Sequence, residues 1–176
     1  MKKTIIPLIF LIVICSVLMT ACWPLGIIFI PDDYELHGSP DDIGEPKDFS
    51  KNGFKITLTD KFTEEESKAG FDPYYVSLFC GVCVMKEEFT EENGLEDLSL
   101  EQYINDVISN NGHTDIQPQT KGGLWYYVKD DATRRDYSYS YKGTDAFWIV
   151  QFICETRYVS VLEDTIQAFA ESVEVE

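Results

Sequence analysis

The stretch AFWIVQFICE, residues 146 to 155, decides the fold because it is apolar on both of its alternating sides. Successive side chains of a β-strand point to opposite faces of the sheet. One face of this stretch would carry Trp148, Val150, Phe152 and Cys154, and the other would carry Phe147, Ile149 and Ile153. A strand that is apolar on both faces is central in its sheet and covered on both sides. We therefore expect a sheet with a packed layer on each face.

The segment just before this strand, RRDYSYSY at residues 134 to 141, alternates tyrosine with polar residues and predicts the partner strand of a β-hairpin. The four residues KGTD, 142 to 145, are taken as the connecting loop. The tyrosines would then form cross-strand pairs on a single face of the sheet. The expected pairs are Tyr141 with Ala146, Tyr139 with Trp148, and Tyr137 with Val150. Upstream, DIQPQT and LWYYVKDD flank Lys121-Gly122-Gly123 and predict a second hairpin.

The N-terminal half of the sheet is predicted from two shorter patterns. FKITLTD, residues 54 to 60, alternates as a half-buried strand does, and the turn signal Asn52-Gly53 suggests that residues 48 to 50 pair with it. The apolar segment 74 to 89 is too long for one average strand. We therefore expect two strands with a bend between Ser77 and Gly81.

Two helices complete the predicted fold. The first begins at Ser99 as N-cap, with Gln102 completing a capping box, and ends at Asn111-Gly112. Its expected buried stripe is Leu100, Ile104, Val107 and Ile108. The C-terminal helix carries its stripe at Tyr158, Leu162, Ile166, Phe169 and Val173. The fold class is α+β, with one mainly antiparallel sheet packed with two helices.

The first residues have the layout of a bacterial export signal. Lys2 and Lys3 precede an uncharged apolar run that ends in Met19, Thr20, Ala21 and Cys22. This ending resembles the lipobox of bacterial lipoproteins, and the resemblance implies that Cys22 becomes the lipid-modified N-terminus. Bulky residues before Cys15 argue against cleavage there. An uncleaved anchor is the alternative, because Ile5 to Ile30 is long enough to span a bilayer, although Pro24 and Gly26 interrupt the run.

The expected organisation is therefore a signal peptide at residues 1–21, a lipid-anchored flexible tether at 22–48 and a single α+β domain at 49–176. Fourteen basic against 31 acidic residues give a net charge of −17, and removal of Lys2 and Lys3 leaves 12 against 31, or −19. Such a domain is repelled by nucleic acid and by anionic headgroups. We expect the lipid to hold it at the extracytoplasmic face of a bacterial cell membrane.

The thiols are the clearest candidates for chemistry. Cys80 and Cys83 form a Cys-x-x-Cys pair inside an apolar strand, without the helix N-terminus that activates redox cysteines. In a straight strand they point to opposite faces. Buried thiols or one structural disulfide among Cys80, Cys83 and Cys154 is the expectation, and the pairing is left open. We expect no metal, no cofactor and no catalytic residue, since no hydrolase or metal motif is present.

A set of aromatic residues is the candidate binding face: Trp125, Tyr127, Tyr137, Tyr139, Tyr141 and Trp148. Beneath a helix these side chains would be core. On an open face they would form a platform for a protein or a glycan.

The order of elements, with FSKNGFKITLTDKF, EQYINDVISNNG and AFWIVQF, resembles the Mog1p/PsbP-like group, including uncharacterised Firmicutes lipoproteins. The resemblance covers about residues 49 to 175 and implies an accessory or adaptor role, since PsbP supports photosystem II and Mog1p binds a small GTPase. No common catalytic residues come with that fold. We expect a non-catalytic binding module with a protein partner at the cell envelope. A surface redox or hydrolytic enzyme using Cys80 and Cys83 and a solute-binding lipoprotein are the alternatives.

Overall fold

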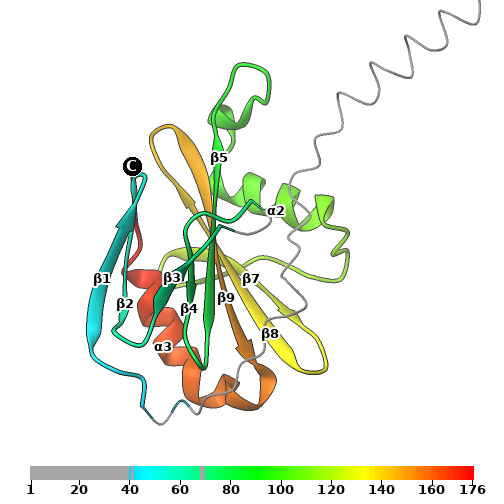
Figure 1. Ribbon diagram of the computed structural model, residues 1–176. Coiled ribbons are helices and arrows are strands. Elements are labelled where there is room, and N and C mark those ends of the chain that lie inside the picture. The colour runs from blue at the N-terminus through cyan, green and yellow to red at the C-terminus, as the bar shows by residue number, and fades with distance from the viewer. Residues whose placement is uncertain (1–39, 41, 68–69) are drawn as a thin grey trace, which may run out of the picture.

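The computed structural model describes residue 40, residues 42–67 and residues 70–176 (Figure 1). The predicted signal peptide, Cys22 and most of the predicted tether lie outside these residues. A three-stranded sheet has the order β1-β2-β10, with β1 at Pro46–Lys51, β2 at Phe54–Thr59 and β10 at Glu174–Val175. Its paired strands are antiparallel.

A seven-stranded sheet has the order β3-β4-β5-β9-β8-β7-β6, and its paired strands are also antiparallel. In chain order its strands are β3 (Thr63–Glu65), β4 (Tyr74–Val76), β5 (Gly81–Glu88), β6 (Gln119–Lys121), β7 (Leu124–Asp130), β8 (Arg134–Lys142) and β9 (Ala146–Glu155). The helices are α2 (Leu100–Asn110) and α3 (Val159–Glu171), with 3-10 turns η1 (Leu95–Asp97) and η2 (Thr156–Tyr158).

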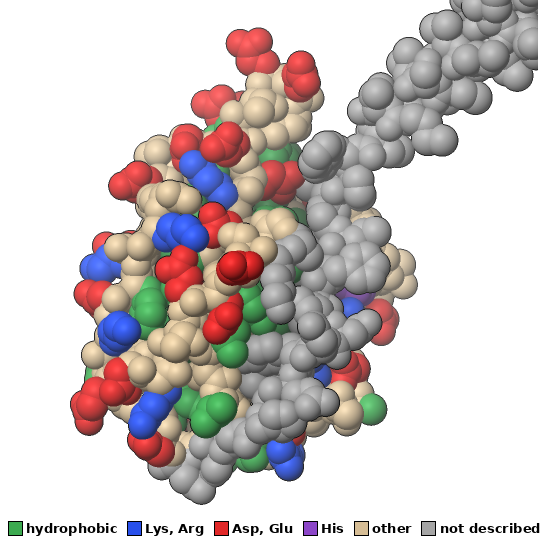
Figure 2. All heavy atoms as spheres, viewed as in Figure 1, with side chains coloured by type: hydrophobic (Ala, Val, Ile, Leu, Met, Phe, Trp, Pro, Cys, Tyr) green, Lys and Arg blue, Asp and Glu red, His purple; other side chains and the backbone are tan. Residues whose placement is uncertain are grey.

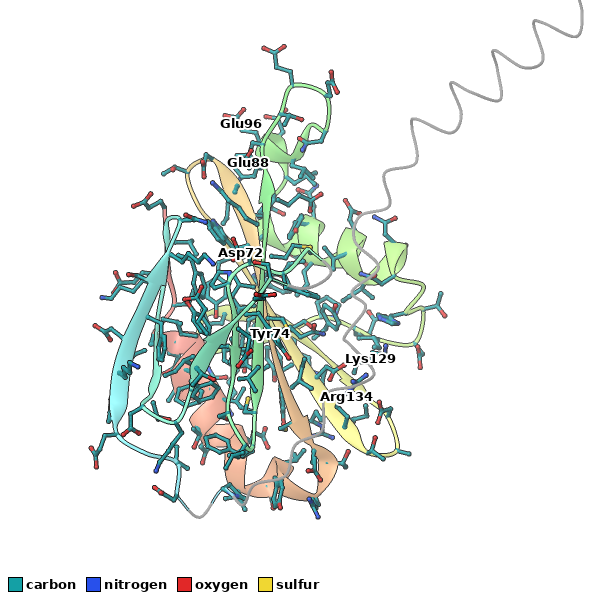
Figure 3. All side chains as sticks on the ribbon, viewed as in Figure 1. Asp72, Tyr74, Glu88, Glu96, Lys129 and Arg134 are labelled. Carbon is teal, nitrogen blue, oxygen red and sulfur yellow. The ribbon has the colours of Figure 1, made fainter. Side chains whose placement is uncertain are left out.

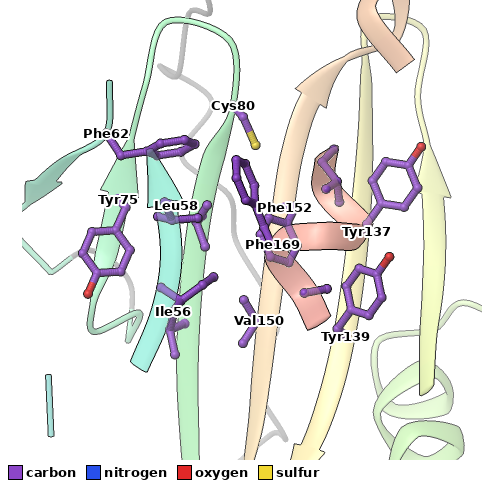
Figure 4. Close-up of a cluster of buried hydrophobic side chains, with 14 of the residues drawn as sticks. Ile56, Leu58, Phe62, Tyr75, Cys80, Tyr137, Tyr139, Val150, Phe152 and Phe169 are labelled. Carbon is purple, nitrogen blue, oxygen red and sulfur yellow. The ribbon is translucent and has the colours of Figure 1, made fainter. Parts of the chain in front are cut away.

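Strand β9 lies in the centre of the large sheet, as predicted, and every residue from Ala146 to Cys154 is buried. One face packs against α3 and the three-stranded sheet, where Trp148, Val150 and Phe152 join a cluster with Ile56 and Phe169 (Figure 4). The other face packs against α2 through a second cluster. The chain is thus a sandwich whose middle layer is covered on both sides.

Local signals in the sequence correctly predict several element boundaries. Ser99 accepts a hydrogen bond from the Gln102 backbone N–H while the Gln102 side chain accepts one from the Ser99 N–H, which is the predicted capping box. The β1–β2 turn places Asn52 and Gly53 at positive φ, as a two-residue hairpin turn requires. The two strands expected within residues 74–89 are β4 and β5.

Four expectations require correction. The strands form two sheets rather than one, because β1, β2 and β10 pair only with each other. Strand β1 begins at Pro46, inside the predicted tether. In α2 the aromatic ring of Tyr103 is fully buried, whereas Leu100 is only partly buried. The fourth correction is the register of the β8–β9 hairpin.

The β8–β9 register differs from the predicted one by two residues. Lys142 pairs with Phe147, and the Gly143 N–H donates to the Ala146 carbonyl, so the chain turns over Thr144 and Asp145 instead of over four residues. The observed pairs are Tyr141 with Trp148, Tyr139 with Val150, and Tyr137 with Phe152. A shift of two keeps every side chain on its predicted face, since side chains alternate with a period of two.

Candidate functional site

The predicted aromatic face is part of the core. The side chain of Tyr139 is 2% exposed, and its hydroxyl donates to Gln167 Oε1 of α3 at 2.9 Å. The Tyr141 hydroxyl donates to the carbonyl oxygen of Ala170 at 2.8 Å. Trp148 and Tyr137 are buried in the same cluster. Because α3 covers these side chains, the condition for an open aromatic platform is not met.

The six aromatic residues also do not share one face. Tyr127 pairs with Ser138 and Trp125 pairs with Ser140, so both lie on the face opposite to Tyr139. There Tyr127 is buried in the α2 cluster and Trp125 packs against it, partly buried. The structure therefore divides the predicted set between the two faces of the large sheet.

In the described part of the chain, the three cysteines Cys80, Cys83 and Cys154 are free and buried. Cys80 and Cys154 lie in the α3-side cluster, whereas Cys83 lies with Phe71 and Ile153 on the opposite face. This confirms that the Cys-x-x-Cys pair points to opposite sides of the sheet. Burial raises the pKa of Cys83 and of Cys154 to about 12, and raises that of Cys80 well above its ordinary value. Thiolates are the reactive form of cysteine, so these groups are poorly reactive in the folded chain.

A buried carboxyl group on β8 was not predicted from the sequence. Asp136 is 3% exposed, and its Oδ1 lies 3.4 Å from Arg134 Nε without a hydrogen bond from any residue that the structure describes. Burial raises the pKa of Asp136 to about 6, although the positive charges of Arg134 and Lys129 lower it. Desolvation outweighs the attraction because the guanidinium stands at ion-pair distance in a poor orientation.

The alternation in RRDYSYSY contained a signal for this burial. If the tyrosines of β8 occupy one face of a covered sheet, Asp136, Ser138 and Ser140 must occupy the other, and all three are buried. A polar set on the inner face of a covered strand is unusual, because buried polar groups cost free energy unless they are hydrogen-bonded. Lys129 and Arg134 lie together at the same end of the sheet (Figure 3).

The surface offers a different candidate, an acidic segment from Glu87 to Asp115. No lysine or arginine occurs between Lys86 and Lys121. Acidic side chains gather at the end of the molecule formed by β5 and η1 (Figure 2), where Glu88 and Glu96 are labelled in Figure 3. The exposed acids of the segment are Glu88, Glu91, Glu92, Glu96, Asp97, Glu101, Asp106 and Asp115.

Several contacts hold the first part of this segment in place. Lys142 Nζ donates to the carbonyl oxygens of Glu96 and Leu98, each at 2.8 Å, and thereby ties η1 to the β8–β9 hairpin. The same ammonium group lies 5.3 Å from the ring centroid of Phe147. Asn93 Nδ2 donates to the Glu88 carbonyl oxygen at 2.8 Å. The acidic surface is consequently presented by an ordered backbone.

A buried hydroxyl anchors α2 beneath this surface. The Tyr103 hydroxyl donates to Glu87 Oε2 at 2.8 Å, and the Tyr103 ring stacks on Phe147 with centroids 3.9 Å apart. Burial raises the pKa of Glu87, while the hydrogen bond from Tyr103 lowers it. The contact joins β5, α2 and β9 at the base of the acidic segment.

None of the helices within residues 42–67 and 70–176 is long and apolar enough to cross a bilayer. Across the same ranges, no group of three or more His, Cys, Asp or Glu residues is arranged to hold a metal ion.

Comparison with known proteins shows the fold. No protein-family model matches the chain, and no curated protein matches it. The solution structure of cyanobacterial PsbP from Synechocystis is similar, with a TM-score of 0.51 and 13% identity over 79% of this chain and 97% of that one.

Two further solved structures have lower scores. The Ran-binding protein Mog1p of Saccharomyces cerevisiae gives a TM-score of 0.48 and 11% identity over 75% of this chain and 96% of that one. LpqN of Mycobacterium tuberculosis, involved in cell envelope biogenesis, gives 0.46 and 11% identity over 77% and 86%. At these scores, neither similarity says anything about the function of this chain. The similarity to cyanobacterial PsbP, together with the antiparallel sheets and two helices, shows that the described part of the chain has the predicted PsbP-like α+β fold.

Proposed function

We propose that the chain is a non-catalytic binding or accessory module, held at the extracytoplasmic face of a bacterial membrane by lipid on Cys22. Burial of Cys80, Cys83 and Cys154 supports a role without thiol chemistry. Five of the six candidate aromatic residues are buried and Trp125 is partly buried, so we place the partner contact on the charged outer surface. The anchor rests on sequence alone: Lys2 and Lys3, the apolar run that follows them, and its ending at Met19 to Cys22. In this proposal residues 1–21 are a signal peptide, and a tether runs from residue 22 towards β1.

Lipid attachment is tested by growing cells with a radioactive fatty acid. The wild-type chain is expected to incorporate label, and Cys22→Ser is expected to lose it to background, because the serine hydroxyl does not replace the modified thiol. Cys15→Ser is the matched control and should label like the wild type. Equal incorporation into wild type and Cys22→Ser would show that the anchor is assigned wrongly.

The acidic segment carries the proposal of a protein partner. Its excess of acidic side chains, on a backbone ordered by Lys142 and Asn93, is the single observation that favours one surface over the others. The partner that fits is an envelope protein with a basic surface, because complementary charge accelerates encounter and excludes other acidic proteins. Nucleic acid and anionic lipid are repelled by the same charge.

Charge reversal tests this partner surface. The double variant Glu91→Lys/Glu92→Lys is expected to reduce partner recovery at least tenfold after cross-linking of intact membranes, and high salt should weaken recovery by the wild type. The matched control is Glu65→Lys/Glu66→Lys, which makes the same charge change at exposed positions on and beside β3. An equal loss in both variants would mean that net charge, and not this surface, determines recovery.

A further inference from the structure

We propose that Cys80 and Cys154 form a disulfide bond that links the start of β5 to the end of β9. The β5–β9 ladder ends with Gly81 paired with Ile153, and the residues just beyond that pair are Cys80 and Cys154, so continuing the register by one residue would bring them face to face. Facing residues of antiparallel strands have Cα atoms about 4.5–5.5 Å apart. Disulfides form across Cα separations of about 4.4–6.8 Å, which is the range that a continued antiparallel register would give this pair.

The side chains also point to the same side. Cys80 is 1% exposed and Cys154 is fully buried, and both belong to the α3-side cluster. In Figure 4 the Cys80 sulfur points into this cluster.

The same geometry excludes the pairing that the Cys-x-x-Cys spacing suggests. Cys83 lies three residues beyond Cys80 on the opposite face, in the cluster of Phe71 and Tyr74. A bond between Cys80 and Cys83 would have to pass through the sheet. Cys83 therefore remains a thiol, and its alkylation provides an internal control when the cysteines are mapped.

Oxidation must occur before the core closes. The two S–H bonds break, one S–S bond forms, and two protons and two electrons pass to an oxidising disulfide, which is reduced to two thiols. Once folded, both cysteines are buried and mostly protonated, so they attack slowly. We expect the bond to form during folding, and the proposed extracytoplasmic location would supply a suitable oxidising disulfide.

This covalent link goes beyond the binding function and has a clear structural result. The loop that it closes, from residue 80 to residue 154, contains the acidic segment, α2 and strands β6 to β8. Cross-linking a long loop restricts the unfolded chain and stabilises the folded one. The base of the proposed partner surface would thus be joined to the central strand.

The test is refolding of the full chain from denaturant in a mixture of oxidised and reduced glutathione. Remaining thiols are then alkylated under denaturing conditions and mapped by mass spectrometry of the unreduced digest. We expect one bond joining the peptides of Cys80 and Cys154, with Cys83 alkylated. The oxidised chain should unfold about 10 °C above the reduced chain.

Two variants keep the outcome decisive. Cys83→Ala should retain both the bond and the thermal shift, whereas Cys154→Ala should lose both without forming a Cys80–Cys83 bond. A bond that includes Cys83, or alkylation of both Cys80 and Cys154 after refolding, would overturn the assignment. Direct mapping of each cysteine also separates this result from any effect of Cys15 or Cys22.

Discussion

Replacing Tyr139 with alanine is expected to lower the free energy of unfolding by about 3–5 kcal/mol. The ring is 2% exposed and packs edge-on against Phe152, with centroids 5.7 Å apart. Truncation removes this contact and leaves a cavity beneath α3. It also leaves Gln167 Oε1 without the hydrogen bond that the Tyr139 hydroxyl donates. Urea unfolding monitored by circular dichroism measures the change.

Two variants separate the causes of that loss. Tyr139→Phe keeps the ring and removes only the hydrogen bond to Gln167, so it should cost about 1 kcal/mol. Tyr126→Ala is the matched ring deletion on the neighbouring strand, where the partly exposed ring stacks on Tyr139 at 5.0 Å, and should cost clearly less than Tyr139→Ala. If Tyr139→Ala costs under about 1 kcal/mol, the aromatic face is open and the core assignment is wrong.

Asp136→Asn is expected to stabilise the folded chain at pH 7.5 by up to about 3 kcal/mol and to have little effect near pH 4. Burial raises the pKa of Asp136 from 3.8 to about 6. A raised carboxyl pKa gives stability that is complete below the unfolded-state pKa and is lost as pH rises through about 6. Asparagine stays neutral, so the difference between variant and wild type should grow between pH 4 and pH 7. Urea unfolding at a series of pH values measures it.

Asp131→Asn is the matched control for this pH dependence. Asp131 accepts hydrogen bonds from the backbone N–H groups of Thr133 and Arg134, which lower its pKa. A lowered pKa gives stability above the unfolded-state value, so this variant should lose stability at pH 7.5 rather than gain it. A constant difference between Asp136→Asn and wild type across the pH range would contradict the buried, raised carboxyl group.

The parts of the fold predicted correctly are those specified by nearby residues. The capping box of α2 needs only Ser99 and Gln102, and the β1–β2 turn needs only Asn52-Gly53. The burial of β9 on both faces follows from its own ten residues. These signals are local, and tertiary packing agrees with them.

The parts predicted incorrectly depend on how one strand pairs with another, which the residues of a single strand do not specify. The faces of Trp125 and Tyr127 depend on the β7–β8 register, which the residues of β7 alone do not specify. Strand β10 has only two residues and is defined by its pairing with β2. Two residues are too few to show a periodic pattern, so the sequence does not predict this strand. The separate small sheet follows from that same pairing.

The candidate site was harder to predict than the fold for a physical reason. Tyrosine and tryptophan suit both a core and a binding surface, since each has an apolar body and a polar tip. Only the position of α3 determines that Tyr139 and Tyr141 direct their hydroxyls into the core. The sequence does not predict the burial of Asp136 directly, because an isolated aspartate is most often exposed.

Photo-cross-linking in living cells tests the proposed partner surface most directly. A photoreactive residue is placed at Glu92 in the acidic segment or, as a control, at Glu66 beyond β3. We expect ultraviolet light to produce a discrete adduct with an envelope protein from position 92 and none from position 66. The adduct should diminish when Cys22→Ser removes the proposed anchor. No adduct from position 92, or the same adduct from both positions, would contradict an anchored module that binds its partner through the acidic segment.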